Sequence, residues 1–376
     1  MTRLLFVSIV LLMTLRPVLA AAGDPTPTQV TWYGYMRLDM AHDTAVSAPG
    51  NYALFVKPHA RGEAVSTLNI TGRQSRLGAR IARGSMTSRL EVDFYGASPE
   101  NKNTVQLRYA VARLPIGDFT LEAGQTSDVI SPLVPRTLNY SVAWGAGNVG
   151  YRRPQVKLFR QTPRTWLGLS LARNITGDLD GDTIVDGAAA ALPAIQARCA
   201  VSLVHVMGRQ ITLGLSGHYG RCNCPARDID YSNWSVNADA TFVVTPGWKI
   251  LAEAYRGANM GAYAGAIYND DTVNGVHSTG GWANLQARIG DSGWSVSTGG
   301  GVDDVDDSDL TKAELNRADV RVRNQVWFAA AFYQLSPEVT LGGELSRWST
   351  LYANTTPGND PEPTSLRIQW SMQADF

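Results

Sequence analysis

The stretch Leu366-Arg-Ile-Gln-Trp-Ser-Met-Gln-Ala-Asp-Phe376 carries the clearest fold signal in this chain. Apolar side chains, from Leu366 through Trp370 to Phe376, alternate without interruption with polar ones, from Arg367 to Asp375. Because side chains of a β-strand point alternately to opposite faces, the segment predicts a strand with one apolar and one polar face. A soluble sandwich could contain such a strand. A long amphipathic strand ending in Phe is more typical of the last strand of an outer-membrane β-barrel.

Residues 1–22 have the pattern of a secretory signal peptide. Arg3 precedes an apolar run from Leu4 to Leu15, and small residues at Ala20 to Ala22 offer cleavage sites. The apolar run is shorter than the roughly 18 residues of a transmembrane helix, and no later stretch reaches that length. We therefore expect residues 1–22 to direct export and residues 23–376 to form a single barrel domain.

Short turns punctuated by Gly and Pro alternate with long polar loops along the chain. Seven short turns, such as Thr245-Pro246-Gly247, and eight long loops make fifteen connections, which implies sixteen strands. Short periplasmic turns, long extracellular loops and an even strand number are what a bacterial outer-membrane barrel requires. We expect an all-β fold, a 16-stranded antiparallel transmembrane β-barrel in a Gram-negative outer membrane, wide enough to hold an aqueous pore.

The positions of aromatic and apolar side chains indicate that the apolar faces of the strands contact lipid rather than a second β-sheet. One predicted strand has an apolar face that we expect to point toward lipid, formed by Val326, Phe328, Ala330 and Phe332. One group of rings comes just after short turns: Phe119, Trp166, Trp248 and Trp294. A second group lies toward the opposite strand ends: Trp234, Tyr255, Trp348 and Tyr352. Two such groups predict the aromatic belts at the two membrane interfaces.

Charge is balanced over the whole chain but concentrated in its first part. The 33 Lys and Arg residues equal the 33 Asp and Glu residues, so net charge indicates no nucleic-acid partner. A turn near Gly84 would place Arg80 opposite Arg89 on the lumen face. The other charged residues that we expect on this face are Arg76, Glu91, Asp93, Arg108 and Glu122. Guanidinium groups bind carboxylates and phosphates, so the arginines either guide anionic solutes or pair with the acidic residues and stiffen the wall.

The third long loop, 126–150, is rich in Pro and aliphatic residues and has Asp128 and Arg136 as its only full charges. Large barrels commonly narrow by folding one outer loop inward. We expect this loop to fold into the lumen, set the size of the pore and present Arg136 across from the wall arginines. The alternative is that it packs under the extracellular rim or against a neighbouring subunit.

Metal binding and catalysis find little support in the sequence. Cys222-Asn-Cys224 is expected in a loop, where a strained local disulfide is one alternative. A metal site is the other, but no Cys or His partner set follows the pair, and Cys199 is expected to face lipid. Asp178, Asp180, Asp182 and Asp186 alternate, but Gly181 comes too early for an EF-hand loop. We expect these acids, like the run from Asp303 to Asp309, to be solvated, with bridging to lipopolysaccharide phosphates as an alternative. No HExxH or G-x-S-x-G pattern occurs, so we expect no enzyme activity, no metal and no cofactor.

Several short motifs together resemble the DcaP-like porins of Gram-negative outer membranes. They are Tyr33-Gly-Tyr-Met-Arg-Leu-Asp39, Gln74-Ser-Arg-Leu-Gly78, Glu91-Val-Asp-Phe-Tyr-Gly96, Leu107-Arg-Tyr-Ala110, Leu121-Glu-Ala-Gly-Gln-Thr126 and Arg152-Arg-Pro-Gln-Val156, concentrated within residues 31–160. The resemblance implies a homotrimer of 16-stranded barrels, a third loop that constricts each pore, and small anions such as dicarboxylates as solutes. The arginines at matching positions are Arg37, Arg76 and Arg108.

The sequence thus predicts a passive porin for small hydrophilic, anionic solutes, with outer-membrane lipid and lipopolysaccharide around it. Two alternatives remain at this point. A plugged barrel would act as a surface adhesin or a structural protein. A general cation-tolerant porin would use the acidic residues expected inside the barrel, which are Asp39, Glu91, Asp93, Asp239 and Glu344.

Overall fold

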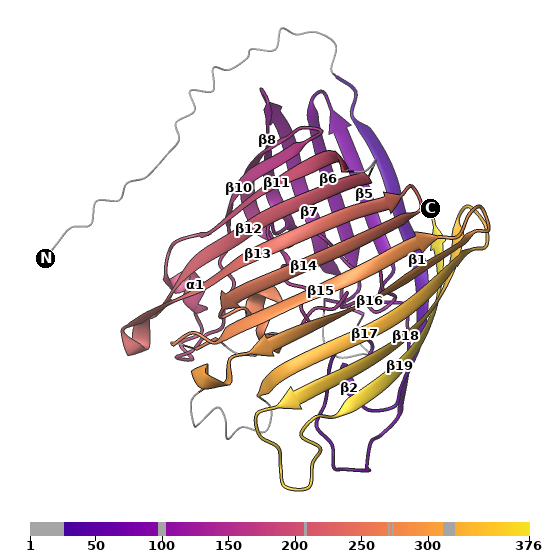
Figure 1. Ribbon diagram of the computed structural model, residues 1–376. Helices are drawn as coiled ribbons and strands as arrows, with labels where there is room; N and C mark the ends of the chain where they lie inside the picture. Colours follow the sequence, from indigo (N-terminus) through magenta and orange to yellow (C-terminus); the bar gives the residue numbers. More distant parts are fainter. Residues whose placement is uncertain (1–25, 97–102, 207–208, 270, 273, 311–319) are drawn as a thin grey trace, which may run out of the picture.

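The computed structural model describes residues 26–96, 103–206, 209–269, 271–272, 274–310 and 320–376, and the predicted signal peptide lies outside them. Within these ranges the chain is a large antiparallel β-barrel with very little helix (Figure 1). No helix in the described residues is long and apolar enough to cross a membrane. The strands of the first half are β1 (Gln29–Asp43), β2 (Ser47–Pro49), β3 (Ala53–Val56), β4 (Thr67–Thr71), β5 (Arg76–Arg83), β6 (Met86–Asp93), β7 (Gln106–Ile116), β8 (Phe119–Ser127), β9 (Arg152–Gln161) and β10 (Thr165–Ala172).

The second half of the barrel has longer strands. They are β11 (Ala194–Val206), β12 (Arg209–Cys224), β13 (Ile229–Thr245), β14 (Trp248–Ala258), β15 (His277–Arg288), β16 (Trp294–Val305), β17 (Arg321–Gln334), β18 (Val339–Tyr352) and β19 (Thr364–Asp375). The short helices lie in the connections and are α1 (Asp186–Ala189), η1 (Pro225–Arg227), η2 (Gly261–Tyr263), η3 (Ala266–Tyr268) and η4 (Asp307–Asp309).

The barrel closes through β1, which pairs with β19 on one side and with β4 and β5 on the other. Pairing with β19 runs from Tyr35 opposite Asp375 to Asp43 opposite Arg367. Both β4 and β5 pair with β1, so these two segments are the halves of one barrel strand, interrupted between Thr71 and Arg76. The 17 segments of the sheet therefore make sixteen barrel strands, which confirms the predicted fold class.

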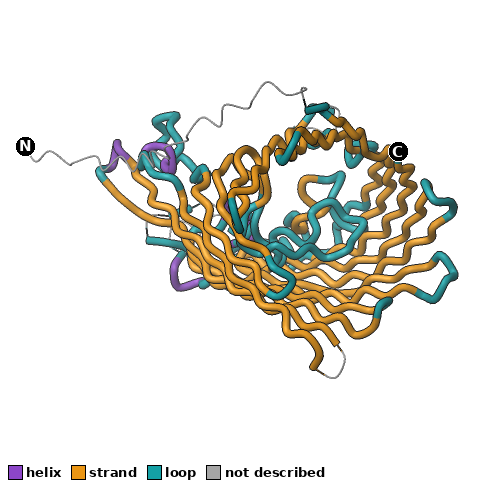
Figure 2. Tube along the Cα trace, turned by 90° about the horizontal axis from the view of Figure 1, so that it is seen from above, coloured by secondary structure: helices purple, strands orange, loops and turns teal. Residues whose placement is uncertain are grey.

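Loop segments fold inside the barrel (Figure 2), and their buried residues belong to three extracellular loops, whereas the sequence predicted only the third to fold inward. They are loop 1 (44–66, which contains β2 and β3), loop 3 (128–151) and loop 6 (259–276, which contains η2 and η3). Their apolar residues form a core inside the barrel, in which Ile130 of loop 3 packs with Met260, Tyr263 and Ile267 of loop 6. This interior apolar core leaves less of the lumen to water than an empty 16-stranded barrel would.

The outward faces follow the predicted alternation on most strands. On β19, Leu366, Trp370 and Met372 are exposed on the outside, while Arg367 and Gln369 are buried inside. The predicted belt at the short turns is confirmed for the exposed rings of Phe119, Trp248 and Trp294.

The prediction was wrong for β17 and for part of the second aromatic belt. On β17 the apolar face points inward, because Val326 and Phe328 are buried and Trp327 is 67% exposed on the outside. Val326 and Trp348 pack against Ala53 of loop 1 and Ala143 of loop 3. Tyr255, Trp348 and Tyr352 are buried inside the barrel as well. Strand periodicity shows which residues share a face, and the inward loops decide which face is covered.

Candidate functional site

The candidate site is the inner face of the strands from β5 to β7, where the first part of the chain places its basic residues. We call the side chains of Arg76, Arg80, Arg89, Arg108 and Arg113 the arginine wall. Arg80 of β5 lies directly opposite Arg89 of β6, as the turn at Gly84 predicted. The short hairpins therefore stack arginines from three consecutive strands on one surface.

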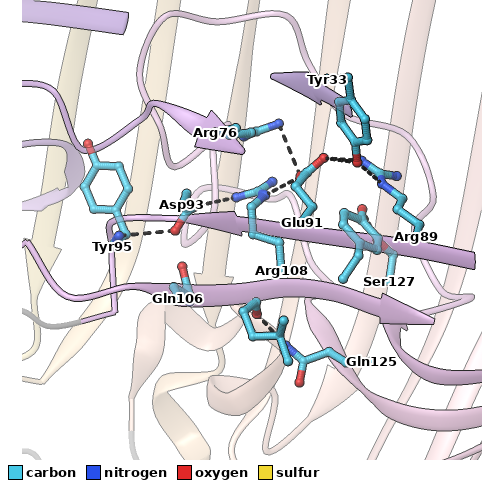
Figure 3. A network of polar contacts seen from close by, with 12 residues as sticks. Tyr33, Arg76, Arg89, Glu91, Asp93, Tyr95, Gln106, Arg108, Gln125 and Ser127 are labelled. Carbon is cyan, nitrogen blue, oxygen red and sulfur yellow. Dashed lines mark hydrogen bonds and ion pairs between the residues drawn. The ribbon is translucent and has the colours of Figure 1, made fainter. Parts of the chain in front are cut away.

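Glu91 of β6 is the centre of the arginine wall (Figure 3). Arg89 Nη2 lies 2.6 Å from one of its carboxylate oxygens, and Arg108 Nε lies 2.8 Å from the other. The hydroxyl of Tyr33 donates a hydrogen bond to the same carboxylate at 2.9 Å. Arg76 Nη1 is farther away, at 4.0 Å. One carboxylate therefore faces three guanidinium groups, and the cluster keeps a net positive charge.

The acidic residues of this cluster lie beneath the basic ones. The side chain of Glu91 is 2% exposed and that of Glu122 is 1% exposed. Their partners reach the lumen, since the side chains of Arg76, Arg89 and Arg113 are 29%, 38% and 53% exposed. A solute in the lumen consequently meets guanidinium groups first, with the neutralising carboxylates behind them.

Asp93 and Arg108 form the buried part of the site and connect it to loop 3. Arg108 Nη1 lies 2.5 Å from Asp93 Oδ2, and neither side chain is more than 8% exposed. The hydroxyl of Tyr140, in loop 3, donates a hydrogen bond to the same oxygen at 3.0 Å. Burial, together with the Asp93 charge, raises the pKa of Tyr140, so that the hydroxyl stays protonated. Removing the charge of either Arg108 or Asp93 would leave the other residue buried without its ion-pair partner.

Glu122 of β8 organises a second pairing toward the periplasmic side. It binds Lys157 Nζ of β9 at 2.7 Å and also pairs with Arg113 of β7. The sequence predicted Glu122 as a lumen residue but identified neither Lys157 nor Arg113. Both residues continue the alternation of their strands, and this pattern could have identified them.

Loop 3 crosses the lumen and is anchored at Leu138. The carbonyl oxygen of Leu138 accepts hydrogen bonds from Arg37, Gln74 and Gln369, at 2.9, 3.1 and 3.1 Å. Its N–H donates to Glu344 Oε2 at 2.5 Å. Arg37 also pairs with Asp39 at 2.7 Å, so this predicted site residue holds loop 3 in place.

The loop continues along the far wall of the barrel, where it covers the remaining acidic residues. Glu253 Oε1 accepts the N–H of Leu133 at 2.7 Å, and Glu344 is capped by Leu138 as described above. Asp239 is paired with Arg198 at 2.7 Å. These three carboxylates are at most 5% exposed. Asp239 and Glu344, which the sequence put inside the barrel, are therefore inside, but they do not line open water.

Arg136 lies on this far wall and not beside the arginine wall. Its N–H donates to Asn284 Oδ1 at 3.1 Å, and its guanidinium stacks on the ring of Phe332 at 4.0 Å. Burial lowers the pKa of Arg136 from its usual value. It lines a cavity of about 740 Å³ near the short turns, together with Lys249 and Gln286.

Two other cavities lie along the arginine wall itself. The first, of about 290 Å³, lies between Arg76 and Arg108 on one side and loop 3 on the other. The second, of about 470 Å³, is lined by Arg80, Arg89 and Arg113. The rings that border the first cavity are Tyr109, Tyr140, Trp144 and Tyr151. A series of water-accessible spaces thus follows the basic side chains.

Arg152 is a further basic residue that the sequence placed only within a family motif. It lies at the end of loop 3, stacks on Tyr151 at 4.6 Å and lines the 290 Å³ cavity. Its side chain is buried, and its Nε and Nη2 atoms have no hydrogen-bond partner. Arg76 Nε is also without a partner. Two guanidinium groups, those of Arg76 and Arg152, therefore line one cavity.

The closed 16-stranded barrel with an inward third loop is the fold of bacterial outer-membrane porins. No protein-family model matches the chain, and no curated protein sequence is similar enough to match. Solved structures do match. The outer membrane channel DcaP of Acinetobacter baumannii superposes with a TM-score of 0.74 at 18% identity, covering 93% of this chain and 97% of that one. The predicted resemblance to DcaP-like porins is thus confirmed at the level of the fold.

Two further structures show the same architecture at greater distance. An anion-selective porin from Comamonas acidovorans has a TM-score of 0.58 and 14% identity, covering 93% of this chain and all of that one. OmpT, an outer membrane protein of Vibrio cholerae solved in a trimer form, has a TM-score of 0.55 and 10% identity, covering 93% and 99% of the two chains.

Proposed function

We propose that this chain is an outer-membrane porin through which small hydrophilic anions diffuse passively. The observation that carries the proposal is the layering of charge at the arginine wall, where exposed guanidinium groups cover buried carboxylates. Basic groups that line a narrow aqueous path raise the local concentration of anions and repel cations. No reaction is involved, and the solute gradient alone drives passage.

Loop 3 is proposed to form the constriction. It is held at Leu138 by hydrogen bonds from β1, β19 and the segment before β5, and it borders the 290 Å³ cavity opposite Arg76 and Arg108. A solute that passes there must fit between the loop and the wall. The guanidinium groups of Arg76 and Arg152 both line this cavity, and guanidinium groups bind carboxylates. Dicarboxylates are the class of solute that two such groups would favour.

The buried positions of the other acidic residues disfavour a cation-tolerant porin. Asp239, Glu253 and Glu344 each bind a partner beneath loop 3 or on the wall, so they add little charge to open water. The three inward loops keep the plugged barrel as the rival, since they fill part of the lumen. Water-accessible cavities along the arginine wall favour the open form.

The wider setting follows from the same proposal. Residues 1–22 would direct export, and the outward apolar faces would contact outer-membrane lipid and lipopolysaccharide. A homotrimer is the expected assembly, as in the trimer form of the OmpT structure. We propose no enzyme activity for this barrel, and passage of a solute requires no cofactor.

Liposome swelling tests the proposal directly. Purified protein is reconstituted into liposomes, and swelling rates are compared for a small dicarboxylate, a neutral sugar and a diamine of similar size. The proposal predicts that the dicarboxylate enters fastest and the diamine slowest. Equal rates for all three solutes would contradict the role of the arginine wall, and no swelling with any solute would support the plugged barrel.

A further inference from the structure

Two extracellular connections that the sequence treated separately come together beside β12. Loop 4 (173–193) carries Asp180 and Asp186, and Cys224 ends β12 at the start of the connection to β13. One carboxylate oxygen of each aspartate and the Cys224 sulfur all lie within 4.8 Å of one another. The cluster thus joins two carboxylates from one loop to a thiol from another. Sequence spacing could not show this, because 38 to 44 positions separate the aspartates from the cysteine (224 minus 186 and 224 minus 180).

Asp186 supplies a second observation, independent of the proximity. Its side chain is completely buried. Oδ2 accepts hydrogen bonds from the Tyr231 hydroxyl at 2.6 Å and from the N–H of Leu179 at 3.3 Å. Oδ1 is buried and has no hydrogen-bond partner. A buried carboxylate oxygen without a donor is costly, and such groups are usually paired or coordinate a metal.

The surroundings hold these ligands in place. Asp180 Oδ2 accepts the N–H of Ala226, two residues after Cys224, at 2.9 Å, so loop 4 is already attached to the other connection. The Cys224 side chain is fully buried, and the three cysteines in the described residues are free thiols.

We propose that Asp180, Asp186 and Cys224 bind one thiophilic divalent cation of the Zn²⁺ class, which fastens loop 4 to the end of β12. Zn²⁺ takes carboxylate oxygen and thiolate sulfur at about 2.0–2.3 Å, so small side-chain movements would bring the three ligands onto one ion. Thiolate sulfur selects this class over Ca²⁺, which takes six to eight oxygen ligands. The thiol loses its proton to solvent when the metal binds. The proposal does not depend on the direction of ion selectivity.

The neighbouring acidic side chains are less suited to the ion. Asp178 accepts backbone N–H groups from Gly181 and Thr183, just as Asp180 accepts those of Asp182 and Ala226. What separates them is position, because Asp180 and Asp186 lie around the Cys224 sulfur, whereas Asp178 and Asp182 are not part of that group. Asp182 Oδ1 accepts the N–H of Ile184 at 2.7 Å. These residues shape the loop, and they provide a charge-matched control for the test.

Cd²⁺ titration of the full-length refolded protein tests the proposal, because a Cd²⁺–thiolate bond has its own ultraviolet absorption. The protein is kept reduced with a phosphine, and unchanged heat-modifiable mobility on gels shows that each variant has folded. We expect one Cd²⁺ per chain with thiolate absorption in the wild type, in Cys222→Ser and in Asp182→Asn. Cys224→Ser should lose the absorption, and Asp186→Asn should weaken binding by about tenfold or more.

Several outcomes would overturn the site. These are a wild type without thiolate absorption, absorption that persists in folded Cys224→Ser, or equal affinities in Asp186→Asn and Asp182→Asn. A disulfide between Cys222 and Cys224 in protein taken from membranes would also overturn it, because the thiolate would then be consumed. If Cys224→Ser does not fold, the comparison of the two aspartate variants decides.

Discussion

Arg76 Nη1 lies 4.0 Å from the Glu91 carboxylate, whereas Arg89 and Arg108 approach the same carboxylate at 2.6 and 2.8 Å. Both oxygens of Glu91 are therefore occupied by other guanidinium groups, and Arg76 is the least neutralised of the three. Arg76 also lines the cavity next to loop 3. Of the three arginines around Glu91, Arg76 is therefore the one whose charge a passing anion should sense most strongly.

Replacing Arg76 should change selectivity without a large loss of stability. Removing one charge about 4 Å from the path changes the energy of a permeating ion by about 1 kcal/mol in a water-filled pore. The shift has opposite signs for an anion and a cation, so their energies change relative to each other by about 2 kcal/mol. We therefore expect Arg76→Ala to lower the anion-to-cation permeability ratio by up to about thirtyfold, as measured by reversal potentials. Arg76→Lys, which keeps the charge, is the matched control and should retain most of the selectivity.

Replacing Arg108 should mainly reduce the stability of the barrel, because the carboxylates that Arg108 binds are buried. Arg108→Ala would leave Asp93 and one oxygen of Glu91 without their cation. Breaking a buried pair by removing one partner costs about 3–5 kcal/mol. We expect a clear fall in unfolding free energy, measured by denaturant titration in detergent. A variant as stable as wild type would show that the pair is not buried in this way.

Glu91→Gln should strengthen the preference for anions, since it removes the negative charge shared by three arginines. Its neutral amide cannot neutralise Arg89 or Arg108, so the wall becomes more basic and less stable. Reversal potentials in a salt gradient give the selectivity. Glu362→Gln is the control, because Glu362 pairs with Arg323 at the extracellular end of the strands, away from the arginine wall. Reduced anion preference in Glu91→Gln would argue against the charge layering.

The anchor of loop 3 can be tested at Glu344. Glu344→Ala removes the acceptor of the Leu138 N–H, whereas Glu344→Gln keeps a carbonyl oxygen that can replace it. We expect larger single-channel current fluctuations in Glu344→Ala than in Glu344→Gln. If loop 3 is held elsewhere, the two variants will have the same current noise.

The corrected orientation of β17 and β18 makes a separate prediction about stability. Trp348 is 1% exposed within the barrel, while Trp327 is 67% exposed on the outer surface. Truncating a buried aromatic side chain costs about 3–5 kcal/mol. Trp348→Ala should therefore destabilise the barrel far more than Trp327→Ala, as measured by denaturant titration. The reverse order would restore the orientation first expected from the sequence.

The periodicity of the sequence was sufficient to predict the strands that form the wall of the barrel. The alternation from Leu366 to Phe376 indicated which side of β19 meets lipid, and the turn at Gly84 fixed Arg80 opposite Arg89. Both are local properties, set by a period of two and by one tight turn. The inward course of loop 3 also followed from its own composition.

Contacts between residues far apart in the chain could not be predicted from local sequence patterns. Val326 and Phe328 share a face by periodicity, but the apolar cover from loops 1 and 3 turns that face inward. Met260 and Ile267 are buried in a loop that the sequence analysis counted among the long polar loops. The alternation of apolar and polar residues shows which side chains share a face of a strand. Only the tertiary contacts decide which of the two faces points into the barrel.

The most direct test of the account is the reversal potential of the wild-type protein in a planar bilayer under a tenfold KCl gradient. The exposed guanidinium groups predict a potential of the sign set by chloride, decreasing in Arg76→Ala. A potential of the sign set by potassium would contradict the arginine wall as an anion path, and the absence of current would contradict the porin itself.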